Sequence, residues 1–149
     1  MFSFFLITVE LADFLEDCLS KVPQLSALKF TDGNFLRLNQ IYYNFSDRMN
    51  IMNGHEETIL PSITLGCRAV ICATANLPNA SYFINKILDP SISLGEKIKT
   101  HYLLVEIVNK VKQTGNGHFF VGLKTLMNKL NPSIQFGLPR PPVYIPKKV

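Results

Sequence analysis

The feature that most constrains the fold of this chain is a hydrophobic period that alternates between helical and strand-like spacing. After Thr8, which we expect to cap a helix, apolar residues recur every three or four positions until Pro23. Residues 25–30 then form a short strand-like run, and residues 33–45 return to helical spacing. This alternation is typical of α/β proteins, in which crossover helices join parallel strands.

The alternation continues to about residue 76, and beyond it the pattern is helical. We predict strands over 48–54 and 68–76, with a helix over 56–66 between them. Beyond Pro78 the pattern is helical only. It predicts three consecutive helices, over residues 78–88, 94–114 and 119–130. This order suits either an open doubly wound sheet or part of a (β/α)8 barrel, and the absence of a GxGxxG or Walker-type loop argues against nucleotide binding.

Composition places the chain among globular proteins and excludes several other classes. Apolar residues make up 47% of the 149 residues and charged residues 17%, far from the disordered range. The net charge of +4 comes from scattered lysines and arginines, so we expect no nucleic-acid partner. The three cysteines and three histidines lack metal-ligand spacing, which predicts no metal and reduced thiols, as in a cytoplasmic protein. No stretch approaches the roughly 18 apolar residues of a membrane span.

The two ends of the chain are interpreted separately. MFSFFLITVE lacks the positive region and the long apolar run of a signal peptide, so we expect a strand that leads into the first helix. LPRPPVYIPKKV is rich in proline and predicts an extended tail, although its RPP segment also suits an SH3-like partner. We therefore expect one domain over 1–149. It comprises βα units to about residue 90, C-terminal helices over 91–131 and a proline-rich tail over 132–149.

Lys29 is the candidate for covalent chemistry. Within strand 25–30, alternation places Leu28 and Phe30 on one face and Lys29 on the other. In a barrel the first face packs on helices, and the second points into the barrel near the carboxyl ends of the strands, where catalytic groups lie. A lysine held there is suited to attack a carbonyl carbon. The competing interpretation, which spacing alone favours, is a lysine that extends its amine into solvent.

Three segments taken together resemble an enzyme family. They are VPQLSALKFTD (22–32), NGHEETILPS (53–62) and LGCRAVICATANLP (65–78). Their order and spacing are similar to those of the N-acetylneuraminate lyase and dihydrodipicolinate synthase superfamily of class I aldolases. GLKTLMNKL (122–130) and the LPRPP tail look like the sialic acid branch. The resemblance implies the second half of a (β/α)8 TIM barrel followed by C-terminal helices. The family's Gly-rich carboxylate-binding loop and its proton-carrying strand tyrosine belong to the first half, which has no counterpart here.

The resemblance also implies roles for individual residues. Lys29 would form a protonated imine with the keto carbon of pyruvate or sialic acid, an electron sink that permits cleavage of the adjacent C–C bond. The implied substrate-binding residues are Thr31, Gly54, Glu56, Glu57 and Ala73. No cofactor and no metal are implied, the partner is a small-molecule substrate rather than a membrane or nucleic acid, and a complete protein is expected to be a homo-oligomer.

Several positions depart from the family pattern and leave alternatives open. Val70 and Cys72 add bulk where the family tends to have glycine, and Ala73 lacks the usual serine hydroxyl. Glu56 replaces the commoner aspartate, and Glu56 and Glu57 also suit the first turn of a helix, where the dipole favours acidic residues. The implied activity is cleavage of sialic acid to pyruvate and N-acetylmannosamine. The alternatives are another pyruvate-dependent aldolase, such as dihydrodipicolinate synthase, and an inactive homologue that acts as an interaction or regulatory protein.

Overall fold

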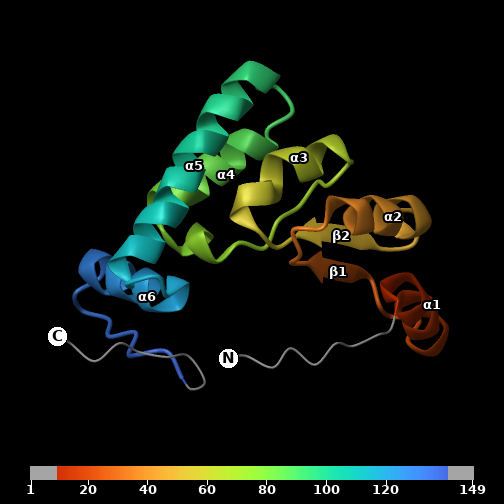
Figure 1. The fold of residues 1–149 in the computed structure, drawn as a ribbon, viewed down its shortest axis with the longest axis horizontal. Coiled ribbons are helices and arrows are strands. Elements are labelled where there is room, and N and C mark those ends of the chain that lie inside the picture. Colours follow the sequence, from red (N-terminus) through yellow and green to blue (C-terminus); the bar gives the residue numbers. More distant parts are fainter. Residues whose placement is uncertain (1–9, 141–149) are drawn as a thin grey trace.

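The computed structural model describes residues 10–140 of the chain. Figure 1 shows two short strands with helices α1 and α2 at one end of the molecule, helices α4, α5 and α6 at the other, and α3 between them. The expected N-terminal strand, the Thr8 cap and the tail beyond Arg140 lie outside the described residues. Helix α1 begins at Leu11, with Glu10 as its N-cap.

In the first part of the fold two helices alternate with two strands. Its elements are α1 (Leu11–Lys21), β1 (Ala27–Phe30), α2 (Phe35–Phe45) and β2 (Asn50–Asn53). The side chain of Asn34 accepts a hydrogen bond from the N–H of Arg37 at 3.1 Å and so caps α2. β1 and β2 pair in parallel, with Lys29 opposite Met52. The predicted parallel strands joined by a crossover helix are therefore confirmed.

A hydrophobic core fills the space between these strands and the two helices. Its buried members are Leu15, Phe30, Leu38, Ile41, Phe45, Met49 and Ile51. Phe30 is buried and Leu28 packs against the same cluster, so β1 presents the predicted face to the helices. The predicted buried stripe of α1 is only partly covered, since Phe14 and Val22 are exposed. Helix α1 lies at the edge of the described fold, where it packs on one side only (Figure 1).

The segment after β2 differs from the prediction in two places. The predicted helix over 56–66 is a 3-10 turn, η1 (Glu56–Thr58), followed by a short helix, α3 (Ile59–Thr64). The predicted strand over 68–76 is wrong beyond a single parallel bridge between Asn53 and Val70, and it ends in a 3-10 turn, η2 (Ala73–Asn76). In this turn the N–H of Thr74 donates to the Glu56 carboxylate at 2.8 Å and the N–H of Ala75 donates to the carbonyl of Cys72 at 3.2 Å, so neither group pairs with a neighbouring strand.

The last three helices have the predicted bounds. They are α4 (Pro78–Leu88), α5 (Leu94–Thr114) and α6 (Phe119–Leu130). Gly115 and Gly122 allow α6 to fold back on the end of α5, because a Cβ on Gly115 would lie 2.5 Å from the backbone nitrogen of Gly122. Within residues 10–140 no helix is both long enough and apolar enough to cross a membrane.

Candidate active site

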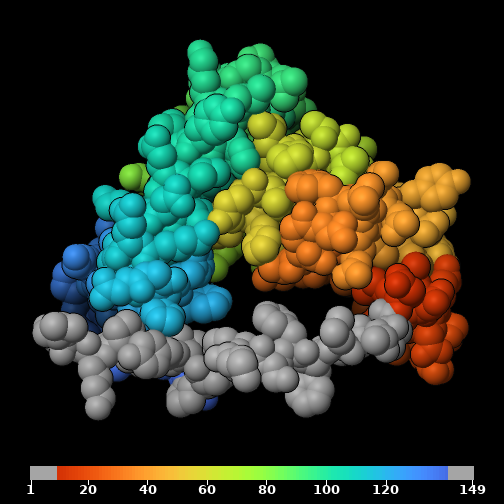
Figure 2. Space-filling view, in the orientation of Figure 1, coloured from red at the N-terminus to blue at the C-terminus, as the bar shows by residue number. Residues whose placement is uncertain are grey.

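A cavity of about 340 Å³ lies at the carboxyl ends of β1 and β2, between the strands and helices α5 and α6. It is lined by all six residues that the sequence predicts for the site, Lys29, Thr31, Gly54, Glu56, Glu57 and Ala73. The other lining residues are His55, Val108, Lys112, Phe119 and Phe120. Figure 2 shows the surface indented between the cyan α5–α6 end and the orange β1–α2 region. The fold thus gathers side chains from across the sequence at one place.

Lys29 lies one residue before the end of β1, and its side chain passes close to the backbone of Gly54. A Cβ on Gly54 would come within 2.7 Å of Lys29 Cε and would overlap Thr31 Oγ1. Gly54 also donates its N–H to the carbonyl of Phe30 at 2.8 Å, which extends the parallel ladder past β2. A side chain at position 54 would therefore displace the Lys29 and Thr31 side chains, which glycine leaves in place.

The surroundings of Lys29 differ from the expectation in one respect. Lys29 and Thr31 are exposed rather than enclosed by a barrel. Within the described residues β1 pairs with β2 alone, so one edge of β1 and the mouth of the cavity beside it are open. Lys29 therefore lines the open side of the cavity, near the carboxyl end of β1.

Glu56 is buried and holds the floor of the cavity together. Its Oε1 accepts hydrogen bonds from the N–H and the hydroxyl of Thr74, each at 2.8 Å. Its main-chain carbonyl accepts a hydrogen bond from His101 Nε2 of α5 at 3.1 Å. The charge of Glu56 also acts on Cys72: burial, followed by this negative charge, raises the pKa of the Cys72 thiol to about 12. Cys72 therefore stays protonated at neutral pH and is no nucleophile.

Glu57 forms an ion pair across the cavity. Lys112 Nζ lies 2.9 Å from Glu57 Oε1, and both side chains are partly exposed. Burial by itself would raise the pKa of Glu57, but the hydrogen bond from Lys112, the residue's own backbone N–H and the charge of Lys112 lower it. Glu57 is therefore ionised at neutral pH. Sequence reasoning missed Lys112, because a lysine in the last turn of a helix is ordinary and nothing links it to a turn 55 residues earlier.

The turn that carries both glutamates is anchored by Asn53, the buried last residue of β2. Asn53 Nδ2 donates to Thr58 Oγ1 at 3.0 Å and to Ser62 Oγ at 2.8 Å. Asn53 Oδ1 accepts the N–H of His55 at 2.6 Å. The end of the strand, the 3-10 turn and α3 are thereby joined through one amide. The sequence carried one signal for this role, an asparagine directly before the Gly-His-Glu-Glu turn.

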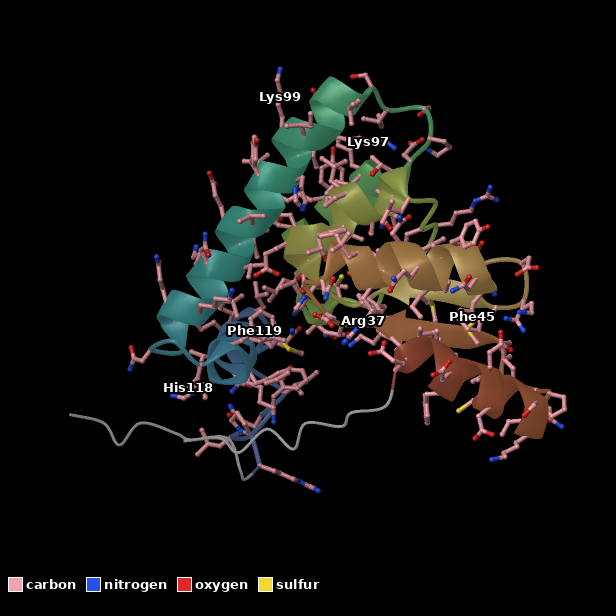
Figure 3. The ribbon with its side chains drawn as sticks, turned by 45° about the vertical axis from the view of Figure 1, so that its right-hand side comes forward. Arg37, Phe45, Lys97, Lys99, His118 and Phe119 are labelled. Carbon is pink, nitrogen blue, oxygen red and sulfur yellow. The ribbon has the colours of Figure 1, made fainter. Side chains whose placement is uncertain are left out.

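The remaining walls of the cavity are apolar. Ala73 opens η2 and adds only a methyl group. Val108 comes from α5, and Phe119 and Phe120 come from the start of α6. Figure 3 places Phe119 at the corner where α6 begins, beside the end of α5. The apolar spacing of the helices did not predict this wall, because the wall forms only when α6 folds back on α5. Within residues 10–140 no group of three or more His, Cys, Asp or Glu side chains is arranged to hold a metal ion.

Comparison with known proteins shows where this fold and these residues belong. Residues 10–146 match the model of the dihydrodipicolinate synthetase family. A 59-residue stretch is 37% identical to 4-hydroxy-tetrahydrodipicolinate synthase from Magnetococcus marinus, over 40% of this chain and 20% of that enzyme.

Two solved structures are similar to the described fold. They are N-acetylneuraminate lyase from Proteus mirabilis, at a TM-score of 0.70 and 18% identity, and N-acetylneuraminate lyase (sialic acid aldolase) from Aliivibrio salmonicida, at 0.68 and 19%. Each covers 93% of this chain, which spans only 45% and 44% of their lengths. At this identity the likeness shows the fold, which is part of a TIM barrel, as the sequence predicts. Because the family model spans almost all of the chain, the chain belongs to the dihydrodipicolinate synthetase family.

Proposed function

We propose that this chain provides the imine-forming part of a class I aldolase site, with Lys29 as the nucleophile. The observation that carries the proposal is the cavity at the carboxyl ends of the strands, where the Lys29 side chain lies beside Thr31, Gly54 and Glu57. Membership of the dihydrodipicolinate synthetase family supports the same chemistry.

The proposed reaction proceeds through a covalent intermediate. The neutral amine of Lys29 attacks the keto carbon of the substrate, and loss of water from the carbinolamine leaves a protonated imine. The imine accepts the electron pair of the adjacent C–C bond as that bond breaks, which gives an enamine and an aldehyde. Protonation of the enamine carbon and addition of water then release pyruvate and regenerate the amine.

A group that removes the proton from the substrate hydroxyl is needed for the cleavage step. Tyr42 is unsuited to this role, because it lines a different cavity and donates its hydroxyl to the carbonyl of Ile51 at 3.0 Å. Burial, followed by its contact with Cys67, also raises the pKa of Tyr42. The proposal therefore assigns imine formation to this chain and leaves the proton-carrying tyrosine of the family to the first half of a barrel.

The substrate that we propose is sialic acid, cleaved to pyruvate and N-acetylmannosamine. Glu57 and Thr31 offer polar contacts for the hydroxyl groups of a sugar, and the wall formed by Val108 and the two phenylalanines suits the methyl of an acetyl group. The two N-acetylneuraminate lyases of similar fold support this choice. The curated relative from Magnetococcus marinus supports the alternative, a pyruvate-condensing synthase. Both begin with the same imine.

The test is reductive trapping. The protein is incubated with pyruvate, reduced with borohydride and weighed by mass spectrometry. We expect one adduct, equal in mass to pyruvate less one oxygen atom, on the peptide that contains Lys29. Lys29→Ala should abolish it. Lys99→Ala is the matched control, because Lys99 is an exposed lysine at the far end of α5 (Figure 3) and should leave the adduct unchanged.

A second candidate is an inactive homologue that serves as an interaction protein. The exposure of Lys29 and Thr31 favours it, because a nucleophile open to solvent lacks the enclosure that aldol chemistry uses. Failure to trap pyruvate at Lys29 in folded protein would support this candidate. For either candidate we propose the cytoplasm, in line with the free thiols of Cys18, Cys67 and Cys72.

A further inference from the structure

The contact between Glu57 and Lys112 joins two distant parts of the chain inside the candidate site. Glu57 belongs to η1, directly after β2, whereas Lys112 lies in the last turn of α5. Their Nζ–Oε1 distance is 2.9 Å, and both side chains line the cavity that contains Lys29. The pair is therefore part of the wall that a bound molecule would meet.

The turn beneath Glu57 has little freedom, because its backbone is held at two points. His101 Nε2 donates to the carbonyl of Glu56 at 3.1 Å, and Asn53 Oδ1 accepts the N–H of His55 at 2.6 Å. Glu56 itself is committed to Thr74 and cannot swing into the cavity without leaving buried donors unpaired. The backbone of Glu57 is thus fixed, and the contact with Lys112 sets the position of its carboxylate.

The charges around Glu57 come from every element that faces it. Lys112 approaches from α5 and His55 from the start of the turn, while Lys29 lines the same cavity from β1. Glu56 is the neighbouring carboxylate, turned towards Thr74. Burial works against ionisation of Glu57, but the hydrogen bonds and the charge of Lys112 outweigh it and lower its pKa. An ionised carboxylate offers about four acceptor positions, so Lys112 leaves several for hydroxyl donors.

We infer that Lys112 is a positioning residue, which holds Glu57 as an ionised acceptor facing the cavity and so gives the site a preference for polyhydroxylated substrates. The inference rests on the proposed function, in that the substrate enters this cavity. It goes further by assigning the choice of substrate to an ion pair between η1 and α5. Loss of Lys112 would weaken binding of the sugar part of the substrate.

The experiment follows the Glu57 carboxyl by NMR in protein labelled with isotopic glutamate. N-Acetylmannosamine is titrated into the unmodified chain, Lys112→Met and Lys112→Arg. We expect a saturable shift of the Glu57 signal, an affinity about tenfold lower in Lys112→Met, and recovery in Lys112→Arg, since one charge-assisted hydrogen bond is removed and restored. Lys86→Met is the matched control, because Lys86 forms a similar pair with Glu96 at 2.6 Å outside this cavity.

A pH titration of the same samples separates positioning from general damage. The pKa of Glu57 should rise in Lys112→Met and stay low in Lys112→Arg, whereas Lys86→Met should move only Glu96, whose pKa Lys86 lowers. Equal sugar affinity in Lys112→Met and the unmodified chain, or no shift at Glu57 in the unmodified chain, overturns the inference. Sugar binding needs no imine, so a missing pyruvate adduct overturns the proposed function alone and leaves this titration readable.

Discussion

The two sides of the cavity are built in different ways. On the β1 side, Lys29 and Thr31 are exposed at the end of a strand that pairs with one described neighbour. On the η1 side, Glu56 and Glu57 are tied to β2, η2 and α5 by hydrogen bonds that converge from all three. One side thus relies on backbone geometry and the other on a polar network.

This difference bears on the proposed function. A network of satisfied buried groups fixes side-chain directions, as recognition of a particular substrate requires. A lysine on an open rim can still meet a keto acid, but it lacks the dry enclosure that favours the later steps. Under the proposed function, the chain therefore combines a preformed surface for substrate recognition with a proposed nucleophile, Lys29, that needs further cover. The predictions below test each side.

The largest effect on stability is expected from Glu56→Ala on the η1 side of the cavity. The change leaves the buried N–H and hydroxyl of Thr74 without their acceptor, and we expect the free energy of unfolding to fall by about 3 kcal/mol. Urea denaturation measures it. Glu57→Ala is the matched control: its pair with Lys112 is partly exposed, so its loss should cost less than about 1 kcal/mol. Equal losses in the two variants would show that burial of Glu56 carries no special weight.

The second largest effect is expected from Gly54→Ala, which acts on the β1 side of the cavity. The added methyl meets Lys29 Cε, Thr31 Oγ1 and the carbonyl of Phe30, so stability should fall by about 1–3 kcal/mol and trapping of pyruvate should slow. Gly33→Ala is the control, since no atom lies within 4 Å of its added Cβ and its φ is not in the left-handed region. If Gly54→Ala traps pyruvate at the rate of the unmodified chain, the close approach of this backbone to Lys29 is unimportant.

A smaller effect is expected from His101→Leu, which tests how α5 holds the turn. The variant removes the donor to the carbonyl of Glu56 and fills similar space, so we expect a loss of about 1 kcal/mol. Tyr102→Leu, at an exposed neighbouring position, should change stability by less than about 0.5 kcal/mol. Thermal melting of the two variants measures the difference, and a Tyr102→Leu loss as large as that of His101→Leu would contradict the assigned contact.

Much of this arrangement could be predicted from the sequence, because local patterns determine it. The bounds of α4, α5 and α6 follow from apolar spacing, from Pro78 at the start of α4 and from Gly115 at the end of α5. The position of Lys29 on β1 follows from the alternation of a short strand. Family resemblance then brought Gly54 and the two glutamates to the same cavity, where the structure places them.

The parts that could not be predicted depend on contacts between distant residues. The segment over 68–76 has the composition of a strand, yet residues 73–76 form the 3-10 turn η2, in which the Glu56 carboxylate accepts two hydrogen bonds from Thr74. Lys112 enters the cavity because the end of α5 lies on the side towards which β1 and β2 point (Figure 1). Periodicity describes which face of an element is apolar, but it carries no information on which polar groups meet across 18 or 55 residues.

The smallest effect concerns the pH dependence of the pair at the centre of the recognition side. The folded pKa of Glu57 lies below its ordinary value of about 4.3, so the pair stabilises the fold fully above that pH and loses this contribution as the pH falls through the folded pKa. In a double-mutant cycle of Glu57→Gln and Lys112→Met, we expect a coupling of a few tenths of a kcal/mol near neutral pH, because both side chains are partly exposed. The coupling should vanish in acid and weaken in high salt. A coupling that persists in acid would mean that contacts other than charge hold Glu57 in place. The β1 side and the η1 side of the cavity would then differ in packing rather than in electrostatics.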